Sequence, residues 1–157
     1  MMILILPLSG HHERQGFDCG DEGLNQWLKQ VARQHMAKGI SSTYVAVESE
    51  SSTAILGFYA ISVAEITGEN LPPVWQKKLP KKIPGFRIGR LAVSKELHGK
   101  RLGRLLLANA ISRIRRIAME VGGSIIIVDA KSSAVTFYQQ YGFEQMRDHP
   151  HHLFLPV

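Results

Sequence analysis

A short basic loop that joins an apolar strand to a long amphipathic helix is the feature that most restricts how this chain can fold. Apolar spacing predicts the strand at residues 86–93 and the helix at about 100–121. The N-terminus of such a helix presents unpaired backbone N–H groups and the positive end of the helix dipole, which favour a phosphate. The glycines and basic residues that could contact this phosphate are Gly99, Lys100, Arg101, Gly103 and Arg104. The stretch is neither a P-loop nor a dinucleotide-binding fingerprint, and an ordinary basic helix opening is the alternative.

The charge of the chain is concentrated in one segment. The 157 residues are 45% hydrophobic and carry a formal net charge of +6, which fits one globular domain. Thirteen of the 19 Lys and Arg residues lie between Gln76 and Arg116, together with a single acid, Glu96, so the segment carries +12 and the remainder −6. This asymmetry favours a polyanionic partner, either a nucleic acid or a phosphate-rich cofactor, although solvated helix faces would also be basic.

Several classes of protein are excluded by what the sequence lacks. No apolar run approaches the roughly 20 residues of a membrane-spanning helix, and residues 1–8 lack the basic start and cleavage site of a signal peptide. A single cysteine, Cys19, excludes a disulfide framework. We therefore expect one domain over residues 1–157 in a soluble, cytoplasmic protein.

The order of predicted elements indicates an α/β fold with a mixed sheet. Helices are expected at 21–38, 100–121 and 134–141, with one helical turn near 75–78. Strands are expected at 2–8, 42–48, 54–67, 86–93, 124–129, 143–146 and 153–155. Asp21 can cap the first helix and Gly39 can end it. The continuous apolar run at 124–129 is typical of a strand buried on both faces.

From residue 86 onward these elements resemble the acetyl-CoA-binding core of the GNAT acetyltransferases. The similarity extends to the short helix, which ends in Phe-Tyr-x-x-Tyr-Gly-Phe at 137–143. The pyrophosphate loop of that family usually reads Gln/Arg-x-x-Gly-x-Gly/Ala. The matching positions hold His98, Arg101 and Gly103, so only the last agrees. Arginine in place of the first glycine should strain the loop, although Gly99 can offset this.

The resemblance implies a GNAT fold, with a central mixed, mostly antiparallel β-sheet flanked by α-helices, and acetyl-CoA as the acetyl donor. It implies that Tyr138 protonates the leaving thiolate as a general acid; core packing is the alternative. Backbone N–H groups at the end of the 86–93 strand would stabilise the thioester oxygen. The residues expected to bind the cofactor are Leu91, Ala92, Val93, His98, Gly99, Lys100, Arg101, Leu102, Gly103, Arg104, Ser132 and Ser133. Helix capping is the alternative for the two serines.

Further motifs are similar to the acetyltransferase toxins of bacterial toxin–antitoxin modules. They are Phe17-x-Cys19-Gly20, Leu24-x-x-Trp27-Leu28, Thr43-Tyr44-Val45, Gly57-Phe58-Tyr59 and Arg90-Leu-Ala-Val. This resemblance covers nearly the whole chain. It implies an enzyme that acetylates the α-amino group of aminoacyl-tRNA, blocks translation, is neutralised by a ribbon-helix-helix antitoxin and forms a homodimer.

The 86–93 strand contains no Asp, Glu or His that could act as a general base. A lysine ε-amine with a pKa near 10.4 would need such a base, whereas an α-amine near 7.7–8.0 needs it much less. The missing base therefore agrees with an aminoacyl substrate, although water or Glu65 could substitute. Phosphate contacts with tRNA are expected from Lys77, Lys78, Lys81, Lys82, Arg87, Arg90, Arg113 and Arg116; a solvated surface is the alternative for each.

Other residues have weaker functional interpretations. Cys19 has no base near it in the sequence and is expected to be structural. His149-Pro-His151-His152 has metal-like spacing, but Asp148 is its only carboxylate and no metal site is expected. Two other functions stay open: an acetyltransferase for a small amine or a protein N-terminus, and a nucleic-acid-binding module on a degenerate GNAT scaffold. Acetyl-CoA binding would separate the enzymes from that module.

Overall fold

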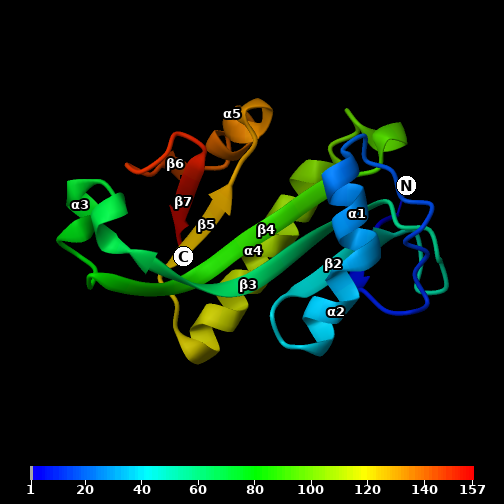
Figure 1. Ribbon diagram of the computed structural model, residues 1–157, viewed down its shortest axis with the longest axis horizontal. Coiled ribbons are helices and arrows are strands. Elements are labelled where there is room, and N and C mark those ends of the chain that lie inside the picture. The colour runs from blue at the N-terminus through cyan, green and yellow to red at the C-terminus, as the bar shows by residue number, and fades with distance from the viewer. Residues whose placement is uncertain (1) are drawn as a thin grey trace. The chain divides into compact units, whose positions relative to one another are not determined.

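The structure is a computed structural model that describes residues 2–157 and has a mixed α/β architecture (Figure 1). The strands are β1 (Leu4–Pro7), β2 (Ser42–Val47), β3 (Gly57–Thr67), β4 (Lys82–Val93), β5 (Ile125–Asp129), β6 (Glu144–Gln145) and β7 (His152–Pro156). The helices are α1 (Glu22–Gln30), α2 (Ala32–Ala37), α3 (Pro73–Gln76), α4 (Leu102–Val121) and α5 (Val135–Gln139). Short 3-10 helices are η1 (Gly68–Asn70), η2 (Lys95–Leu97) and η3 (Ser132–Ala134).

The described strands form one sheet in the order β1-β2-β3-β4-β5-β7-β6. β1 with β2, β2 with β3, β5 with β7 and β6 with β7 are antiparallel, whereas β4 with β5 is parallel. The mixed, mostly antiparallel sheet implied by the resemblance is therefore confirmed. The parallel pairing covers Gly85–Ile88 and Ile125–Val128, and β4 then continues to Val93 beyond its last β5 partner.

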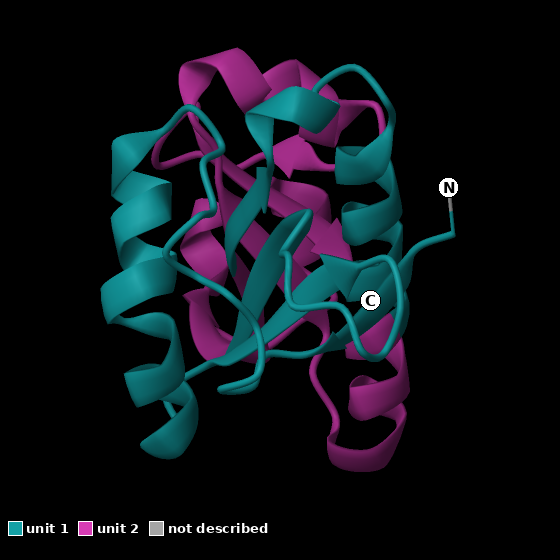
Figure 2. Cartoon of the chain, turned by 90° about the vertical axis from the view of Figure 1, so that its right-hand side faces the viewer, with its two compact units in different colours: residues 1–62, 89–112 teal, residues 63–88, 113–157 magenta. Residues whose placement is uncertain are grey.

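The chain divides into two compact units, residues 1–62 with 89–112 and residues 63–88 with 113–157 (Figure 2). In the first unit, helices pack on both faces of β3. Phe58 stacks on Trp27 of α1, with 6.0 Å between ring centroids. The hydroxyl of the next residue, Tyr59, donates to Asn109 Oδ1 of α4 at 2.6 Å. Because successive residues of a strand point to opposite faces, α1 and α4 cover opposite faces of this part of the sheet.

The second unit has its own apolar core. Ile66, Leu71, Ile83, Ile125, Ile127 and Phe154 form it. Trp75 of α3 packs edge-on against Phe154. All four apolar residues of β5 are at most 6% exposed, as the sequence predicts for a strand covered on both faces. Among the described residues, no helix is both long and apolar enough to cross a membrane.

Some predicted boundaries are wrong. The helix expected at 21–38 is two helices, because Val31 departs from helical geometry with φ −116°. Its predicted start is confirmed, since Asp21 Oδ1 accepts the Leu24 N–H at 3.2 Å. β3 starts three residues later than predicted and β4 four residues earlier. Val121, predicted on the buried stripe of α4, is 74% exposed, because the buried part of that stripe ends at Ile114. The remaining elements agree within two residues.

Candidate active site

The predicted phosphate loop connects β4 to α4 and lies in the first unit. After η2, the Lys100 N–H donates to the Leu97 carbonyl at 3.2 Å, and His98 Nε2 lies 2.9 Å from the Val93 carbonyl oxygen. The Leu105 N–H donates to the Arg101 carbonyl at 3.2 Å. The N–H groups of residues 102–104 therefore belong to the first turn, which has no carbonyl partners within the helix. They are the donors that a phosphate at this helix terminus would use.

Arg101 has a left-handed backbone conformation with φ +64°, which no other non-glycine residue in the described chain adopts. Gly99, two residues earlier, has φ +81°. A side chain in this conformation costs roughly 1–2 kcal/mol. Position 101 is the one at which the family usually has glycine, so the expected strain is confirmed and the loop keeps its turn despite it.

The cations of this loop are available to a ligand. Lys100, Arg101 and Arg104 are exposed, and none of them forms an ion pair with another residue of the described chain. Three unneutralised cations beside the N-terminus of a 20-residue helix make a strongly anion-binding surface.

Asp18 anchors the start of the loop. Its carboxylate accepts the Gly20 N–H at 2.9 Å and the Asn25 side-chain amide at 3.0 Å, and lies 3.0 Å from Lys95 Nζ. The Lys95 N–H also donates to the Asp18 backbone carbonyl at 2.9 Å. Hydrogen bonds from Gly20, Lys95 and Asn25 hold the pKa of the Asp18 carboxyl well below its usual range. The segment before α1 is thus attached to η2, where the loop begins.

Tyr138 lies on α5 in the second unit and is 8% exposed. Its ring packs edge-on against Phe137 and Phe143, with centroids 5.2 and 5.5 Å apart. Burial raises the pKa of the Tyr138 hydroxyl to about 12, so the group keeps its proton at neutral pH, as a general acid must. The hydroxyl has no hydrogen-bond partner among residues 2–157. Tyr138 therefore packs in the core and still has a proton to donate.

The other predicted cofactor contacts are found at two places. Leu91, Ala92 and Val93 lie on the part of β4 that has passed its last pair with β5. Ser132 and Ser133 are exposed on η3. The capping alternative for these serines is wrong, because the N-cap of α5 is Ala134 and no side chain caps that helix.

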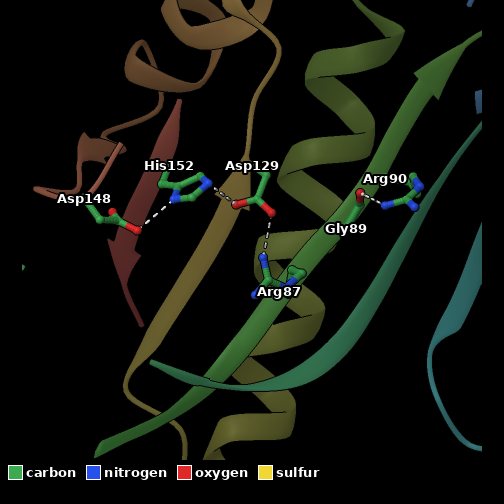
Figure 3. A network of polar contacts seen from close by, with 6 residues as sticks. All are labelled: Arg87, Gly89, Arg90, Asp129, Asp148 and His152. Carbon is green, nitrogen blue, oxygen red and sulfur yellow. Dashed lines mark hydrogen bonds and ion pairs between the residues drawn. The ribbon is translucent and has the colours of Figure 1, made fainter. Parts of the chain in front are cut away.

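The residues predicted to contact RNA differ in their exposure and in their contacts with other side chains. Lys77, Lys78, Lys81, Lys82 and Arg116 are exposed, and Arg113 is half-buried. The exposed guanidinium of Arg90 lies 5.1 Å from the ring centroid of Trp27 and donates to the Gly89 carbonyl at 2.8 Å (Figure 3). Arg87 forms an ion pair, with Nη1 2.9 Å from Asp129 Oδ2.

The sequence did not predict a polar network that joins the middle of β4 to the end of β5 and the start of β7. His152 lies between two carboxylates, with Nδ1 2.9 Å from Asp148 Oδ2 and Nε2 3.6 Å from Asp129 Oδ1 (Figure 3). Asp129 also binds Arg87. In the described chain, no cluster of three or more His, Cys, Asp or Glu side chains could hold a metal ion. Cys19 is buried and forms no disulfide, and its Sγ lies 3.5 Å from the Asp21 carbonyl oxygen.

The sequence and structure were compared with those of known proteins. Residues 16–152 match the model of the acetyltransferase (GNAT) domain. A tRNA-acetylating toxin of Mycobacterium tuberculosis is 29% identical over 88% of this chain and 82% of its own length. The structure of AtaT complexed with acetyl-methionyl-tRNAfMet has a TM-score of 0.90 and 32% identity, covering 98% of this chain and 94% of that one. A Tyr-to-Phe mutant of AtaT, bound to the C-terminus of the antitoxin AtaR and acetyl-CoA, has a TM-score of 0.83 and 26% identity over 98% and 92%. This chain belongs to the GNAT acetyltransferase family.

Proposed function

We propose that this protein is an acetyl-CoA-dependent N-acetyltransferase that acetylates the α-amino group of aminoacyl-tRNA and so blocks translation. The observation that carries the proposal is the similarity to tRNA-bound AtaT over 98% of this chain. An exposed cationic loop at the N-terminus of α4 and a protonated, buried Tyr138 hydroxyl agree with it.

The proposed reaction is a direct transfer. The neutral amine attacks the thioester carbonyl, and the C–S bond of the resulting tetrahedral intermediate then breaks. Tyr138 donates its proton to the departing sulfur, and the proton released by the amine passes to water. Backbone N–H groups of residues 91–93 stabilise the oxyanion, because this part of β4 has no pair on β5.

Coenzyme A is bound, in this proposal, by the loop and the first turn of α4. Backbone N–H groups of residues 102–104 hold the pyrophosphate, and Lys100, Arg101 and Arg104 neutralise it. His98 fixes the loop through its contact with Val93. Ser132 and Ser133, which are free of any capping role, contact the pantetheine.

The proposed contacts with tRNA phosphates are made by Lys77 and Lys78, which follow α3, by Lys81 and Lys82 at the start of β4, and by Arg90, Arg113 and Arg116. Arg87 contributes less to phosphate binding than the sequence suggested, because Asp129 already neutralises it. We further propose that residues 1–157 act as one GNAT domain in a cytoplasmic homodimer, and that a ribbon-helix-helix antitoxin neutralises the enzyme.

The function is tested by incubating the protein with acetyl-CoA and a pool of charged tRNAs, and then analysing the aminoacyl ends by mass spectrometry. We expect N-acetyl-aminoacyl ends on at least one isoacceptor, and none on amines or peptide N-termini supplied at the same concentration. Acetylation of the free amines or peptides with every aminoacyl-tRNA left unmodified would contradict the proposal.

A further inference from the structure

A cavity of the second unit has no role in the reaction proposed above. Its volume is about 200 Å³, and its polar lining comes from β3, η1, β4, β5, the segment after β6 and β7. Ile66, Ile127 and Met146 supply apolar surface. A small concave site with a few convergent polar groups is the usual form of a ligand-binding pocket.

One part of the lining is held in place by its own contacts. Asp129 is bound by Arg87 at 2.9 Å, and His152 contacts both Asp129 and Asp148 (Figure 3). These four side chains come from three strands and the segment that precedes β7. The network fixes two carboxylates at the cavity before any ligand arrives, which lowers the entropic cost of binding.

The rest of the polar lining has no partner. The side chains of Glu65, Thr67 and Asn70 form no hydrogen bond or ion pair with residues 2–157. Glu65 is therefore a carboxylate at the cavity whose charge nothing in the described chain neutralises. It is also the residue that the sequence analysis considered as a substitute for the missing base.

The charge of the cavity selects its ligand. Three carboxylates (Glu65, Asp129 and Asp148) outnumber the single guanidinium of Arg87, so the lining carries a net charge of −2 with His152 neutral and −1 with it protonated. Such a site repels the phosphates of RNA and of coenzyme A and attracts a cation. The carboxylates also offer oxygen acceptors for the three N–H bonds of an ammonium group.

The cavity lies where the parallel pairing of β4 with β5 ends. Asp129 directly follows Val128, the last residue of β5 that pairs with β4. In sheets with parallel strands, ligands bind beyond the carboxyl ends of those strands. The chain that leaves β5 here leads directly to η3 and then to α5, which carries Tyr138.

We infer that this cavity binds a protonated amine of the acceptor, with Glu65 as the carboxylate that pairs with it. The inference rests on the proposed function and names a subsite of the acceptor. Two parts of an aminoacyl end carry this chemistry: the α-ammonium of any amino acid before it loses its proton, and the side-chain cation of a lysyl or arginyl group.

The first test compares kinetics of the wild type with those of Glu65→Gln. KM and kcat are measured for lysyl-, arginyl-, methionyl- and glycyl-tRNA. We expect Glu65→Gln to raise KM about fivefold, the effect of losing one exposed ion pair of the stronger kind, with kcat nearly unchanged. A higher KM for every accepted aminoacyl-tRNA identifies the α-ammonium as the group bound in the cavity. A higher KM for lysyl- and arginyl-tRNA alone identifies the side-chain cation. The control Glu69→Gln removes the same charge four residues away, outside the cavity lining, and should leave KM unchanged.

A second test does not depend on turnover. The wild type is titrated with lysinamide, and with the uncharged analogue N-acetylnorleucinamide, while the imidazole signals of His152 are followed by NMR. We expect shifts with lysinamide only, and weaker binding by Glu65→Gln. The inference is overturned if lysinamide causes no shift and Glu65→Gln leaves KM unchanged. Failure of the proposed function is distinguishable, because lysinamide would then bind while no aminoacyl-tRNA is acetylated.

Discussion

The phosphate loop before α4 and the cavity beside β5 have opposite charges and are built in opposite ways. The loop presents three exposed cations that no acid of the described chain neutralises, together with backbone donors. At the cavity, two of three carboxylates are already held by Arg87 and His152. A polyanion can be bound by any sufficient number of donors and cations, whereas an amine must be bound in a defined place. In the functions proposed above, the loop therefore supplies binding strength and the cavity supplies positioning.

The two regions also differ in backbone strain. In the loop, Arg101 has the left-handed φ that usually requires glycine. No residue of the cavity lining has a positive φ. A phosphate that accepts hydrogen bonds from the backbone N–H groups after Arg101 would stabilise the strained turn. Part of the binding free energy would then offset the strain at Arg101.

Tyr138→Phe should have the largest effect, and it tests whether binding and chemistry are separate. The variant removes one hydroxyl with no hydrogen-bond partner in the described chain, so the fold should be unchanged. We expect kcat to fall by about 10²–10⁴, the usual contribution of a general acid, while the Kd for acetyl-CoA stays the same. Tyr141→Phe, on the same short segment, is the control and should retain activity. Wild-type activity in Tyr138→Phe would show that Tyr138 has only a structural role.

Removal of two loop charges should have the next largest effect. In contrast to Tyr138→Phe, it should change the Kd for acetyl-CoA and not kcat. We expect the double variant Lys100→Gln/Arg104→Gln to raise the Kd for acetyl-CoA about tenfold, at roughly 0.7 kcal/mol for each exposed charge. Calorimetry should also show a weaker dependence of Kd on salt, with kcat at saturation nearly unchanged. The matched control Lys38→Gln/Arg115→Gln removes two exposed charges outside every predicted site. An equal loss in the control would show that total charge, and not the loop, determines binding.

The loop could be predicted from the sequence because everything that defines it is local. A strand, two glycines, several basic residues and an amphipathic helix follow each other within residues 86–121, and each element has its own sequence signal. The sequence indicated strain at Arg101, whereas its left-handed φ is known from the structure. The start of β4 was missed because Lys81, Lys82 and Pro84 resemble a loop. In the structure Lys82 and Pro84 are exposed and Ile83 is buried between them, so the strand alternates as an amphipathic strand should.

The cavity could not be predicted, because it depends on which strands are neighbours. Arg87 and Asp129 meet only because β4 pairs with β5 in parallel, and His152 joins them only because β7 pairs on the other side of β5. No local pattern encodes these pairings. Taken from the sequence, Arg87 suggested an RNA contact and the histidine run suggested a metal-like spacing. Both interpretations overlooked Asp129, which contacts Arg87 and His152, whereas Asp148 had been noted beside the histidines.

Arg101→Gly should sharpen the difference in strain between the two regions. Glycine adopts the left-handed conformation without strain, which stabilises the folded state, but it also increases the entropy of the unfolded chain. Because the relief of strain is the larger of the two effects, we expect the free energy of unfolding to rise by about 0.5–1 kcal/mol. Acetyl-CoA should nevertheless bind more weakly, because one cation of the loop is lost. Lys100→Gly is the control: its backbone has no positive φ, so the same substitution should lower stability. Chemical denaturation measures both variants, and a stabilisation of Lys100→Gly as large as that of Arg101→Gly would be inconsistent with strain at position 101.

The smallest effect is expected from Asp18→Asn, which tests how the loop is anchored. Hydrogen bonds from Gly20, Lys95 and Asn25 lower the pKa of the Asp18 carboxyl from its ordinary value of 3.8, so its charged form stabilises the folded state. That stabilisation is complete at neutral pH and is lost as the pH falls below 3.8 toward the lower pKa of the folded state. We therefore expect Asp18→Asn to be less stable than the wild type at pH 7, and the difference between them to shrink in strong acid. Glu22→Gln removes an exposed carboxylate four residues away and should not change the acid-unfolding curve in this way. A stability difference that is independent of pH would mean that the Asp18 carboxylate does not contribute through its charge, and that the backbone hydrogen bond from Lys95 alone holds the loop.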